Sequence, residues 1–309
     1  MILKPLISIV VVTYNSQDYV LETLESIKKQ TYSPIELIIS DDFSKDNTVQ
    51  ICNDWLNNNK NHFTDSKLIT TQNNSGIPAN CNRGIATARG EWIKIIAGDD
   101  LLLPDAIEKY IGFAEQNSDC EIMHSKVIRM VHRGNQIDFI SAEKEVKTLN
   151  ENMSAEEQFN LLKFSSMVKA PSVIIKRSVI QSLNYFDESI KLCEDWPFWL
   201  KLTSSGKKFF FVDHELILYR IHDSSVYSSV ENKFLISPFY KIEHDIYTKY
   251  IRKKVSFLER LIFDYHFSLQ KFFFKLNNNS AQNLLKKMYG VLNLPYRTYA
   301  KIIFLKNYK

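Results

Sequence analysis

Gly90-Glu91-Trp92-Ile93-Lys94-Ile95-Ile96-Ala97-Gly98-Asp99-Asp100 is the stretch of this chain that says most about its fold. An apolar-leaning run of strand length ends there at two adjacent carboxylates. Two like charges at the end of a strand repel each other and resist burial, so they favour a cation or water as a partner. Ligands of α/β folds bind just beyond the carboxyl ends of parallel strands, and carboxylates there suit Mg²⁺ or Mn²⁺. The alternative is a solvated turn, because Asp is also a favoured turn residue.

The first 115 residues alternate between strand-like and helix-like segments. Continuous β-branched runs predict strands that are buried on both faces, and the segments between them carry apolar residues at helical spacing. The predicted strands are 6–13, 35–40, 67–71 and 92–96, and helices are expected to follow each of them. Strands and helices that alternate with short connections indicate a parallel, doubly wound sheet.

The rest of the chain is more mixed. We expect a hairpin of 121–131 and 136–140, a helix at 154–164, and strands at 172–175 and 208–212. Apolar residues at helical spacing then predict a long amphipathic helix, followed by two shorter ones. Its stripe consists of Leu258, Leu261, Ile262, Tyr265, Leu269, Phe272, Phe273 and Leu276. The expected organisation is one α/β domain with halves 1–116 and 117–229, and a basic helical tail, 230–309.

Composition limits the class of protein. The four cysteines lie far apart, which argues against a zinc site or a disulfide framework and fits a cytoplasmic protein. No secretory signal and no uncharged apolar run of membrane-spanning length is evident. The net charge of +4 hides an asymmetry, because residues 233–309 hold 15 Lys or Arg against 4 Asp or Glu. Residues 1–232 therefore carry a net charge of −7.

Three acidic pairs are candidates for chemistry: Asp41-Asp42, Asp99-Asp100 and Glu194-Asp195. The first two follow strands of the predicted parallel sheet, so both should lie along its carboxyl edge. The turn after the first strand contains no glycine, which excludes the dinucleotide-binding fingerprint, and the phosphate-binding P-loop pattern is also absent. A nucleotide bound here must therefore be held by side chains and a metal ion.

The order and spacing of these motifs resemble family 2 glycosyltransferases of the GT-A fold, the bacterial group that builds O antigens, capsules and exopolysaccharides. The resemblance rests on residues 8–15, 36–48 and 82–100 and, more weakly, on 186–188, 193–196 and 219–222. It implies an α/β fold with a mostly parallel sheet, followed here by a helical extension. It also implies an inverting, metal-dependent enzyme that uses a nucleotide-diphosphate sugar, with UDP as the expected nucleotide.

The resemblance carries roles over to matching positions. Thr13 and Tyr14 would border the nucleobase, Asp41 would accept a hydrogen bond from uracil, and Asp99 would hold the divalent ion, Mn²⁺ or Mg²⁺. The full set of expected donor-binding residues is Thr13, Tyr14, Asn15, Asp41, Asn82, Arg83, Asp100 and Arg220. His222 is a second candidate metal ligand, although a lone His after a strand is more often structural.

Asp195 matches the acid that acts as catalytic base, and Glu194 is its nearest substitute. The competing interpretation is structural: Pro197 suits the first position of a helix, so Trp196 would cap it and Asp195 would only support the helix dipole. The aromatic residues that follow Asp195 could stack on an acceptor sugar or could form helix core.

Two positions depart from the family pattern. Ala97 stands where the first acid of the Asp-x-Asp motif is usual, and Cys81 stands where Arg is common. These departures keep open a catalytically inactive binding or scaffold subunit of a polysaccharide assembly complex. A sugar nucleotidyltransferase would need a glycine- and arginine-rich loop after the first strand, which 10–16 lacks.

The favoured interpretation is transfer of a sugar to a growing glycan or a lipid-linked acceptor in surface polysaccharide synthesis. The basic amphipathic tail predicts association with an anionic membrane surface, and packing on the body or oligomerisation is the alternative. The expected location is the cytoplasm, peripheral on the cytoplasmic face of the inner membrane. No nucleic-acid partner is expected.

Overall fold

The computed structural model describes residues 4–133, 136–141, 149–222, 236–276 and 283–307. The chain divides into two units, one of residues 1–158 with 166–221 and the other of residues 159–165 with 222–309. The predicted boundary between 229 and 230 lies outside the described residues, as does the tip of the predicted hairpin at 134–135. The predicted division at 116 stays a prediction.

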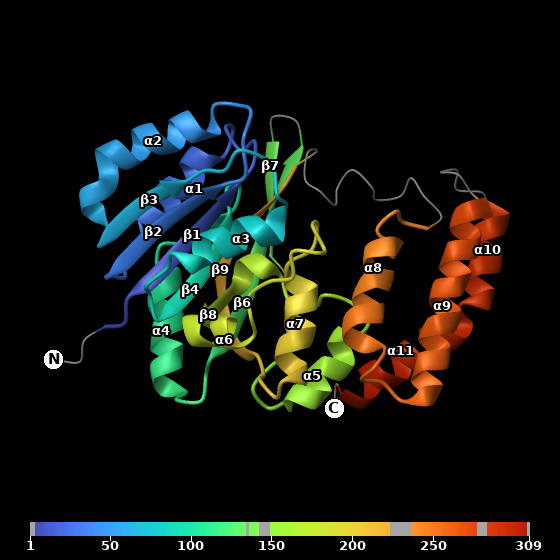
Figure 1. Ribbon diagram of the computed structural model, residues 1–309. Helices are drawn as coiled ribbons and strands as arrows, with labels where there is room; N and C mark the ends of the chain where they lie inside the picture. Colours follow the sequence, from blue (N-terminus) through green and yellow to red (C-terminus); the bar gives the residue numbers. More distant parts are fainter. Residues whose placement is uncertain (1–3, 134–135, 142–148, 223–235, 277–282, 308–309) are drawn as a thin grey trace. The chain divides into compact units, whose positions relative to one another are not determined.

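The first unit is built on a sheet whose first half is parallel, as predicted (Figure 1). Its strands run in the order β3-β2-β1-β4, and every pairing among them is parallel. The strands are β1 (Ile7–Thr13), β2 (Ile35–Asp41), β3 (Asp65–Ile69) and β4 (Trp92–Ala97). The helices between them are α1 (Val20–Lys28), α2 (Thr48–Asn59), the 3₁₀ turn η1 (Lys60–His62) and α3 (Ile77–Ala86). The third strand begins two residues before its predicted start.

The second half of the sheet is mixed. The order continues as β8-β6-β9-β5. β8 is antiparallel to both β4 and β6, β9 is parallel to β6 and antiparallel to β5, and β7 pairs with β6 antiparallel, off this path. The strands are β5 (Leu101–Leu102), β6 (Ile122–Arg133), β7 (Gln136–Ser141), β8 (Val173–Lys176) and β9 (Phe210–Ile221). The helices are α4 (Ala106–Gln116), α5 (Ala155–Leu162), η2 (Ala170–Ser172), α6 (Arg177–Ser182) and α7 (Asp195–Ser204). The hairpin prediction is confirmed, whereas β9 is far longer than 208–212.

Alternate residues of β1 face opposite sides of the sheet, which is why the fold is doubly wound. Ile7, Ile9 and Val11 belong to one core cluster with residues of α1, α2 and α4. Val10 faces the other side, where α3 approaches so closely that a Cβ on Gly84 would lie 2.4 Å from Val10 Cγ1. Only glycine allows that approach, so α3 is held directly against the central strand.

The second unit is helical within the described residues. Its elements are α8 (Tyr240–Ile246), the π-helical turn η3 (Tyr247–Ile251), α9 (Phe257–Leu276), α10 (Asn283–Leu292) and α11 (Leu294–Asn307). Lys163, nearly fully buried, donates hydrogen bonds to Glu259 of α9 (2.5 Å) and to Tyr299 of α11 (2.8 Å). The Phe164 ring stacks on Phe263 at a centroid distance of 5.6 Å. These contacts tie residues 159–165 to the terminal helices.

The predicted stripe of α9 is only partly covered. Leu269 and Phe273 are buried, whereas Leu258, Leu261 and Phe272 are 68%, 49% and 56% exposed. All eight residues lie within about a third of the helix circumference, and only the edge of the stripe toward Phe273 is buried. Among the described residues, no helix is both long enough and apolar enough to cross a bilayer.

Candidate active site

Three strands end together at the carboxyl edge of the parallel half-sheet. Thr13 is aligned with Asp41 in the β1–β2 pair, and Val12 with Ala97 in the β1–β4 pair. Asp41 and the turn that leads to Asp99 therefore lie on one edge of the sheet, as the strand order predicts.

Asp41 is almost fully buried, and its carboxylate is held by its own neighbourhood. Oδ1 accepts a hydrogen bond from Ser44 N at 2.9 Å, and Oδ2 accepts from Thr13 Oγ1 at 2.9 Å and Ser44 Oγ at 2.5 Å. A carboxylate offers about four lone-pair sites, so one position on Oδ1 stays available for a further donor. Thr13 and Asp41 thus form the fixed floor of a candidate nucleotide site.

The loops after β1 and β2 are tied to each other above that floor. Asn15 adopts a left-handed conformation, with φ of 51°. Its N–H donates to Ser44 Oγ at 2.8 Å, and its Oδ1 accepts from Lys45 N at 2.8 Å. Tyr14 stays 49% exposed beside them. The side chain of Asn15 is therefore used in holding the loops, while the Tyr14 ring is open to solvent.

Asp42 differs from Asp41 because its carboxylate forms an ion pair with Arg83. Its carboxylate accepts from Ser75 N and Oγ, from Gly76 N, and from Arg83 Nη2 at 3.1 Å. Burial tends to raise the pKa of Asp42, but these hydrogen bonds outweigh it and hold the pKa below its ordinary value. Arg83 also donates to Asn80 Oδ1 at 2.9 Å. Arg83 therefore connects α3 to the β2 edge, and any diphosphate contact would have to share its guanidinium.

The turn after β4 is held close to β1. Gly98 N donates to Val12 O at 2.9 Å, and a Cβ at Gly98 would lie 2.8 Å from Thr13 Cγ2. A side chain at this position would push the turn away from the strand. Gly98 therefore fixes the distance between the β1 edge and the acids at 99 and 100.

Asp100 is turned inward. It is 1% exposed, and its Oδ1 accepts the backbone N–H of Arg220 at 2.9 Å. Burial, with the charge of Asp99 beside it, raises the pKa of Asp100 well above its ordinary value. The neutral acid is thereby favoured, so Asp100 serves this turn as a hydrogen-bonding group more than as an anion.

Arg220 clamps the same turn from β9. Its Nε donates to the backbone oxygen of Asp99 at 2.7 Å, its Nη2 to Glu22 at 2.6 Å, and its Nη1 lies 2.8 Å from His132 Nε2. The side chain is 1% exposed, and the guanidinium sits over the Tyr19 ring. All three guanidinium nitrogens are thus engaged within the chain, and Arg220 acts on the acidic turn as a positioning residue.

Asp99 is the half-buried member of the pair. Among the described residues, no group of three His, Cys, Asp or Glu side chains is placed to hold a metal ion. Mg²⁺ is commonly bound by one or two carboxylates plus substrate phosphates and water, so a single carboxylate here fits an ion that arrives with a diphosphate. His222 belongs to the second unit, and its role as a ligand stays a prediction.

The third acidic pair stands at the start of α7. The helix begins at Asp195 and not after Pro197, so the prediction that Trp196 caps it was wrong. Asp195 Oδ1 accepts from Trp196 N at 2.6 Å, and Oδ2 accepts from Ser166 Oγ at 3.0 Å. Burial, joined by the charge of Asp195, raises the pKa of Glu194 to about 8. Burial also raises the pKa of Asp195, although its hydrogen bonds work against this. Burial therefore overcomes the positive helix end, which would otherwise lower both pKa values.

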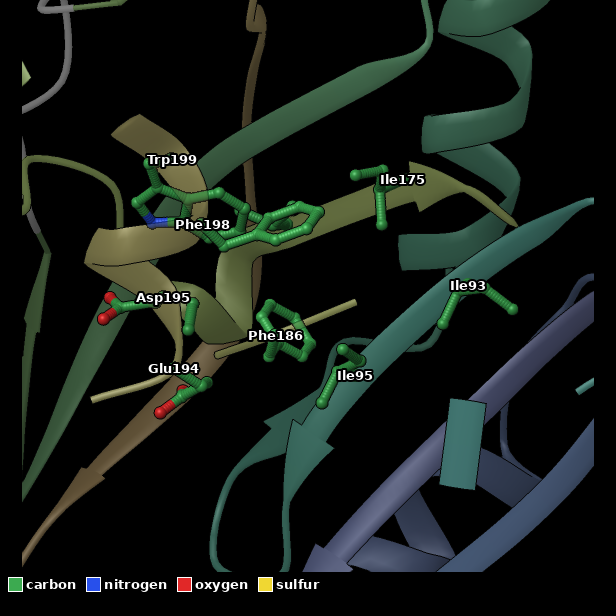
Figure 2. Close-up of a pocket in the computed structure, with 10 residues that line it drawn as sticks. Ile93, Ile95, Ile175, Phe186, Glu194, Asp195, Phe198 and Trp199 are labelled. Carbon is green, nitrogen blue, oxygen red and sulfur yellow. The ribbon is translucent and has the colours of Figure 1, made fainter. Parts of the chain in front are cut away.

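An apolar hollow adjoins this pair (Figure 2). Both carboxyl groups point away from the aliphatic side chains of Ile93 and Ile175. The residues that line the hollow are Ile93, Ile95, Ala170, Val173, Ile175, Phe186, Glu194, Asp195, Phe198 and Trp199. Phe198 and Trp199 are buried, with Phe198 against Phe186 and Trp199 against Phe209, so they form helix core.

Tyr219 is a functional candidate that the sequence did not single out. It is half-buried on β9, and burial followed by the charges of Asp100, Asp99, Asp195 and Glu194 raises its pKa to about 12. One phenol is thus close enough to feel both acidic pairs. Its only signal in the sequence was its place beside Arg220.

Asn82 has a different place from the one its motif implies. Its Nδ2 donates to Phe186 O at 3.0 Å and to Glu188 at 2.9 Å, and its Oδ1 accepts from Phe186 N at 3.0 Å. Asn82 therefore anchors the segment that leads to α7. Its donor-binding role stays a prediction. Cys81, next to it, is buried, and a thiol carries no positive charge in either protonation state, so it cannot supply the charge of the usual Arg.

Comparison with known proteins places this geometry in a family. The model of Glycosyl transferase family 2 matches residues 8–181, more than half of the chain. An uncharacterized glycosyltransferase of Haemophilus influenzae is 30% identical over 231 residues, which are 74% of this chain and 84% of that protein. An uncharacterized glycosyltransferase of Methanocaldococcus jannaschii is 27% identical over 243 residues, or 78% of this chain and 79% of that protein.

Solved structures show the same fold. Residues 1–349 of Staphylococcus aureus TarS, in complex with UDP-GlcNAc, superpose with a TM-score of 0.60 at 18% identity. The match covers 98% of this chain and 89% of that one. A longer TarS structure is covered only to 43% of its length.

Proposed function

Because the chain belongs to glycosyl transferase family 2 and is thus a glycosyltransferase, we propose that it is an inverting, metal-dependent enzyme. It moves a sugar from a UDP-sugar to a hydroxyl group of its acceptor. The observation that carries the proposal is the alignment of Thr13 with Asp41 and of Val12 with Ala97, which brings Asp41 and the turn before Asp99 to one edge of the sheet.

The nucleotide is assigned to the edge formed by Thr13, Tyr14, Asn15 and Asp41. Asp41 Oδ1 accepts one hydrogen bond, from Ser44 N, and keeps a lone pair for the N–H of uracil. The exposed ring of Tyr14 can lie along a base. UDP-GlcNAc is the ligand in the TarS complex, which supports a UDP-sugar without naming the sugar used here.

Asp99 is assigned to the metal and the diphosphate. A bound Mn²⁺ or Mg²⁺ supplies Lewis-acid stabilisation of the negative charge on the leaving diphosphate. Ala97 offers no second carboxylate, and Asp100 is held inward by Arg220 N. Asp99 therefore gives the protein's share of the coordination, and Arg220 keeps the turn in place through the Asp99 carbonyl oxygen.

Asp195 is assigned as the general base. It removes the proton from the attacking acceptor hydroxyl while Ser166 Oγ, bonded to Oδ2, fixes the direction of the carboxylate. The raised pKa makes the ionised carboxylate a better proton acceptor than an ordinary Asp. General-base catalysis of this kind contributes about 10² to 10⁴ in rate. Attack from the face opposite the diphosphate inverts the anomeric centre.

The acceptor is assigned to the class of growing or lipid-linked glycans of a surface polysaccharide, such as an O antigen, capsule or exopolysaccharide. A lipid-linked acceptor would be met at the cytoplasmic face of the inner membrane.

The test is release of UDP from a panel of UDP-sugars, with Mn²⁺ and with a mixture of glycan acceptors. We expect release from one or a few donors, its loss when EDTA removes the metal, and its return with added Mn²⁺. The exposed-surface variant Asp119→Asn should behave as the unaltered chain. No release from any donor would overturn the proposal and favour the inactive scaffold subunit.

A further inference from the structure

Large exposed apolar side chains gather on the last three helices. In the described part of the chain, most of the large apolar residues that face solvent lie on α9, α10 and α11. They are Phe257, Leu258, Leu261, Tyr265, Phe272, Leu276, Leu284, Met288, Val291, Leu292, Leu294, Ile302 and Leu305. We call these residues the apolar face. So many on one small unit exceeds the scattered exposed apolar residues of an ordinary surface.

The apolar face of α9 lies opposite the face that forms its core. Leu258, Leu261, Tyr265 and Phe272 recur at spacings of three, four and seven, so they lie on one side of the helix. The buried residues Phe263 and Phe267 fall on the other side. A helix that is apolar on both sides needs a second partner besides its own core.

The stripe continues onto the neighbouring helices. Leu284, Met288, Val291 and Leu292 share one side of α10 at helical spacing. Tyr265 of α9 donates its hydroxyl hydrogen to the backbone oxygen of Leu292 at 2.9 Å. The exposed residues of α9 and α10 therefore adjoin each other at this contact.

The charges around the apolar face have one sign. The exposed basic residues of these helices are Lys271, Lys275, Lys286, Lys287, Arg297, Lys301 and Lys306. The two acidic residues of 257–309, Glu259 and Asp264, are engaged by Lys163 and Arg252. No acid of these helices is left to offset the basic side chains, so this side of the unit is positive.

We propose that the apolar face and its basic border dock on an anionic lipid surface. The apolar side chains enter the region between headgroups and acyl chains, and the lysines meet the lipid phosphates. A second copy of the chain fits less well, because it would bring the same uncompensated positive charges together. The helices lie on the bilayer, since no described helix is fit to span it. This proposal does not rest on the sugar-transfer reaction.

Co-sedimentation of the full chain with vesicles tests the proposal, without donor or acceptor. We expect binding to vesicles of phosphatidylcholine mixed with phosphatidylglycerol, weak binding to phosphatidylcholine alone, and release as salt is raised. Equal binding to both kinds of vesicle, or to neither, would overturn it.

Paired variants locate the surface. Lys275→Gln with Lys287→Gln should weaken binding about 10- to 30-fold, since each basic residue near the surface contributes about 1 kcal/mol. Lys29→Gln with Lys60→Gln, two exposed lysines of the first unit, is the matched control and should bind unchanged. Leu261→Gln should also weaken binding, whereas Leu21→Gln, equally exposed at 49%, should not. Circular dichroism checks that each variant is folded.

Self-association is the competing outcome. Analytical ultracentrifugation without lipid should give a monomer for the unaltered chain and for Leu261→Gln alike. A stable oligomer that dissociates in Leu261→Gln, together with no binding to anionic vesicles, would assign the apolar face to contact between copies and overturn the proposal.

Discussion

Asp99–Asp100 and Glu194–Asp195 are two pairs of adjacent acids in the first unit that differ in burial and in hydrogen-bond partners. In the first pair Asp100 is buried, where the Arg220 N–H binds it, and Asp99 is half-buried. In the second pair both acids are half-buried beside an apolar hollow, and burial raises both pKa values. The first pair thus fits the proposed roles of a support and a metal ligand, and the second fits the proposed role of a base.

Two adjacent acids in a sequence therefore do not have a fixed chemistry, which depends on how each carboxyl group is buried and hydrogen-bonded. A carboxylate that meets a cation and phosphates must stay ionised, so its partner's charge has to be removed by burial and hydrogen bonding. A general base that works near neutral pH needs a raised pKa, and burial raises it by disfavouring the charged carboxylate.

Asp195→Asn should lower the rate of sugar transfer about 10³-fold or more, because the amide cannot take the acceptor proton. The amide still accepts from Ser166, so the affinity for UDP, measured by calorimetry with Mn²⁺, should not change. If the variant still transfers sugar at the normal rate, another residue is the base and the proposed difference between the two acidic pairs is wrong.

Asp99→Asn should weaken Mn²⁺-dependent UDP binding at least about 100-fold, since loss of a ligand costs no less than loss of its supporting contacts. Asp100→Asn is the matched variant. Its amide oxygen can still accept the Arg220 N–H, and Asp100 is already held toward its neutral form, so UDP binding should change little. Equal losses in both variants would contradict the division of the first pair.

Arg220→Met should lower the free energy of unfolding by about 2 kcal/mol, because it leaves the buried carbonyl oxygen of Asp99 without its donor. Glu22→Gln removes only a partner whose side chain is 58% exposed, so it should cost less than about 1 kcal/mol. Urea denaturation measures both. Equal stability of the two variants would show that Arg220 does not clamp the turn.

Glu194→Gln should leave the acid limb of the pH–rate profile in place, because Glu194, with its pKa raised to about 8, is still protonated where Asp195 ionises. The ionised base is needed, so the rate of the unaltered enzyme should rise with pH. Stability should do the reverse. The folded chain keeps the Glu194 proton that the unfolded chain loses near pH about 4.3, so the free energy of unfolding falls between there and about 8.

Thermal melts of the unaltered chain and of Glu194→Gln across that pH range check the sign. The variant should lose less stability as pH rises. A steeper fall in the variant would mean that Glu194 is not the group held neutral by burial.

Local sequence patterns predicted much of the fold. The β-branched run at 6–13 predicted β1, which spans Ile7–Thr13, and parallel alternation predicted the shared edge of Asp41 and Asp99. The sequence predicted the β6–β7 hairpin but not the pairing of β8 with β4, the pairing of β9 with β6 or the length of β9, because those contacts join residues that are far apart in the chain. It also misplaced the start of α7, where Pro197 was given more weight than the capping geometry allows.

The sequence alone predicts the alternation of strands and helices, the position of acidic pairs just after two strands, and the basic and apolar character of the last helices. Spacing and composition suffice for these because they express local preference and period. Tertiary contacts, in contrast, decide that Asp100 is buried while Asp99 is half-buried, that Arg220 holds the turn from β9, and which side of α9 is left uncovered. Those outcomes depend on burial and on partners brought together from distant parts of the chain, and no local pattern records them.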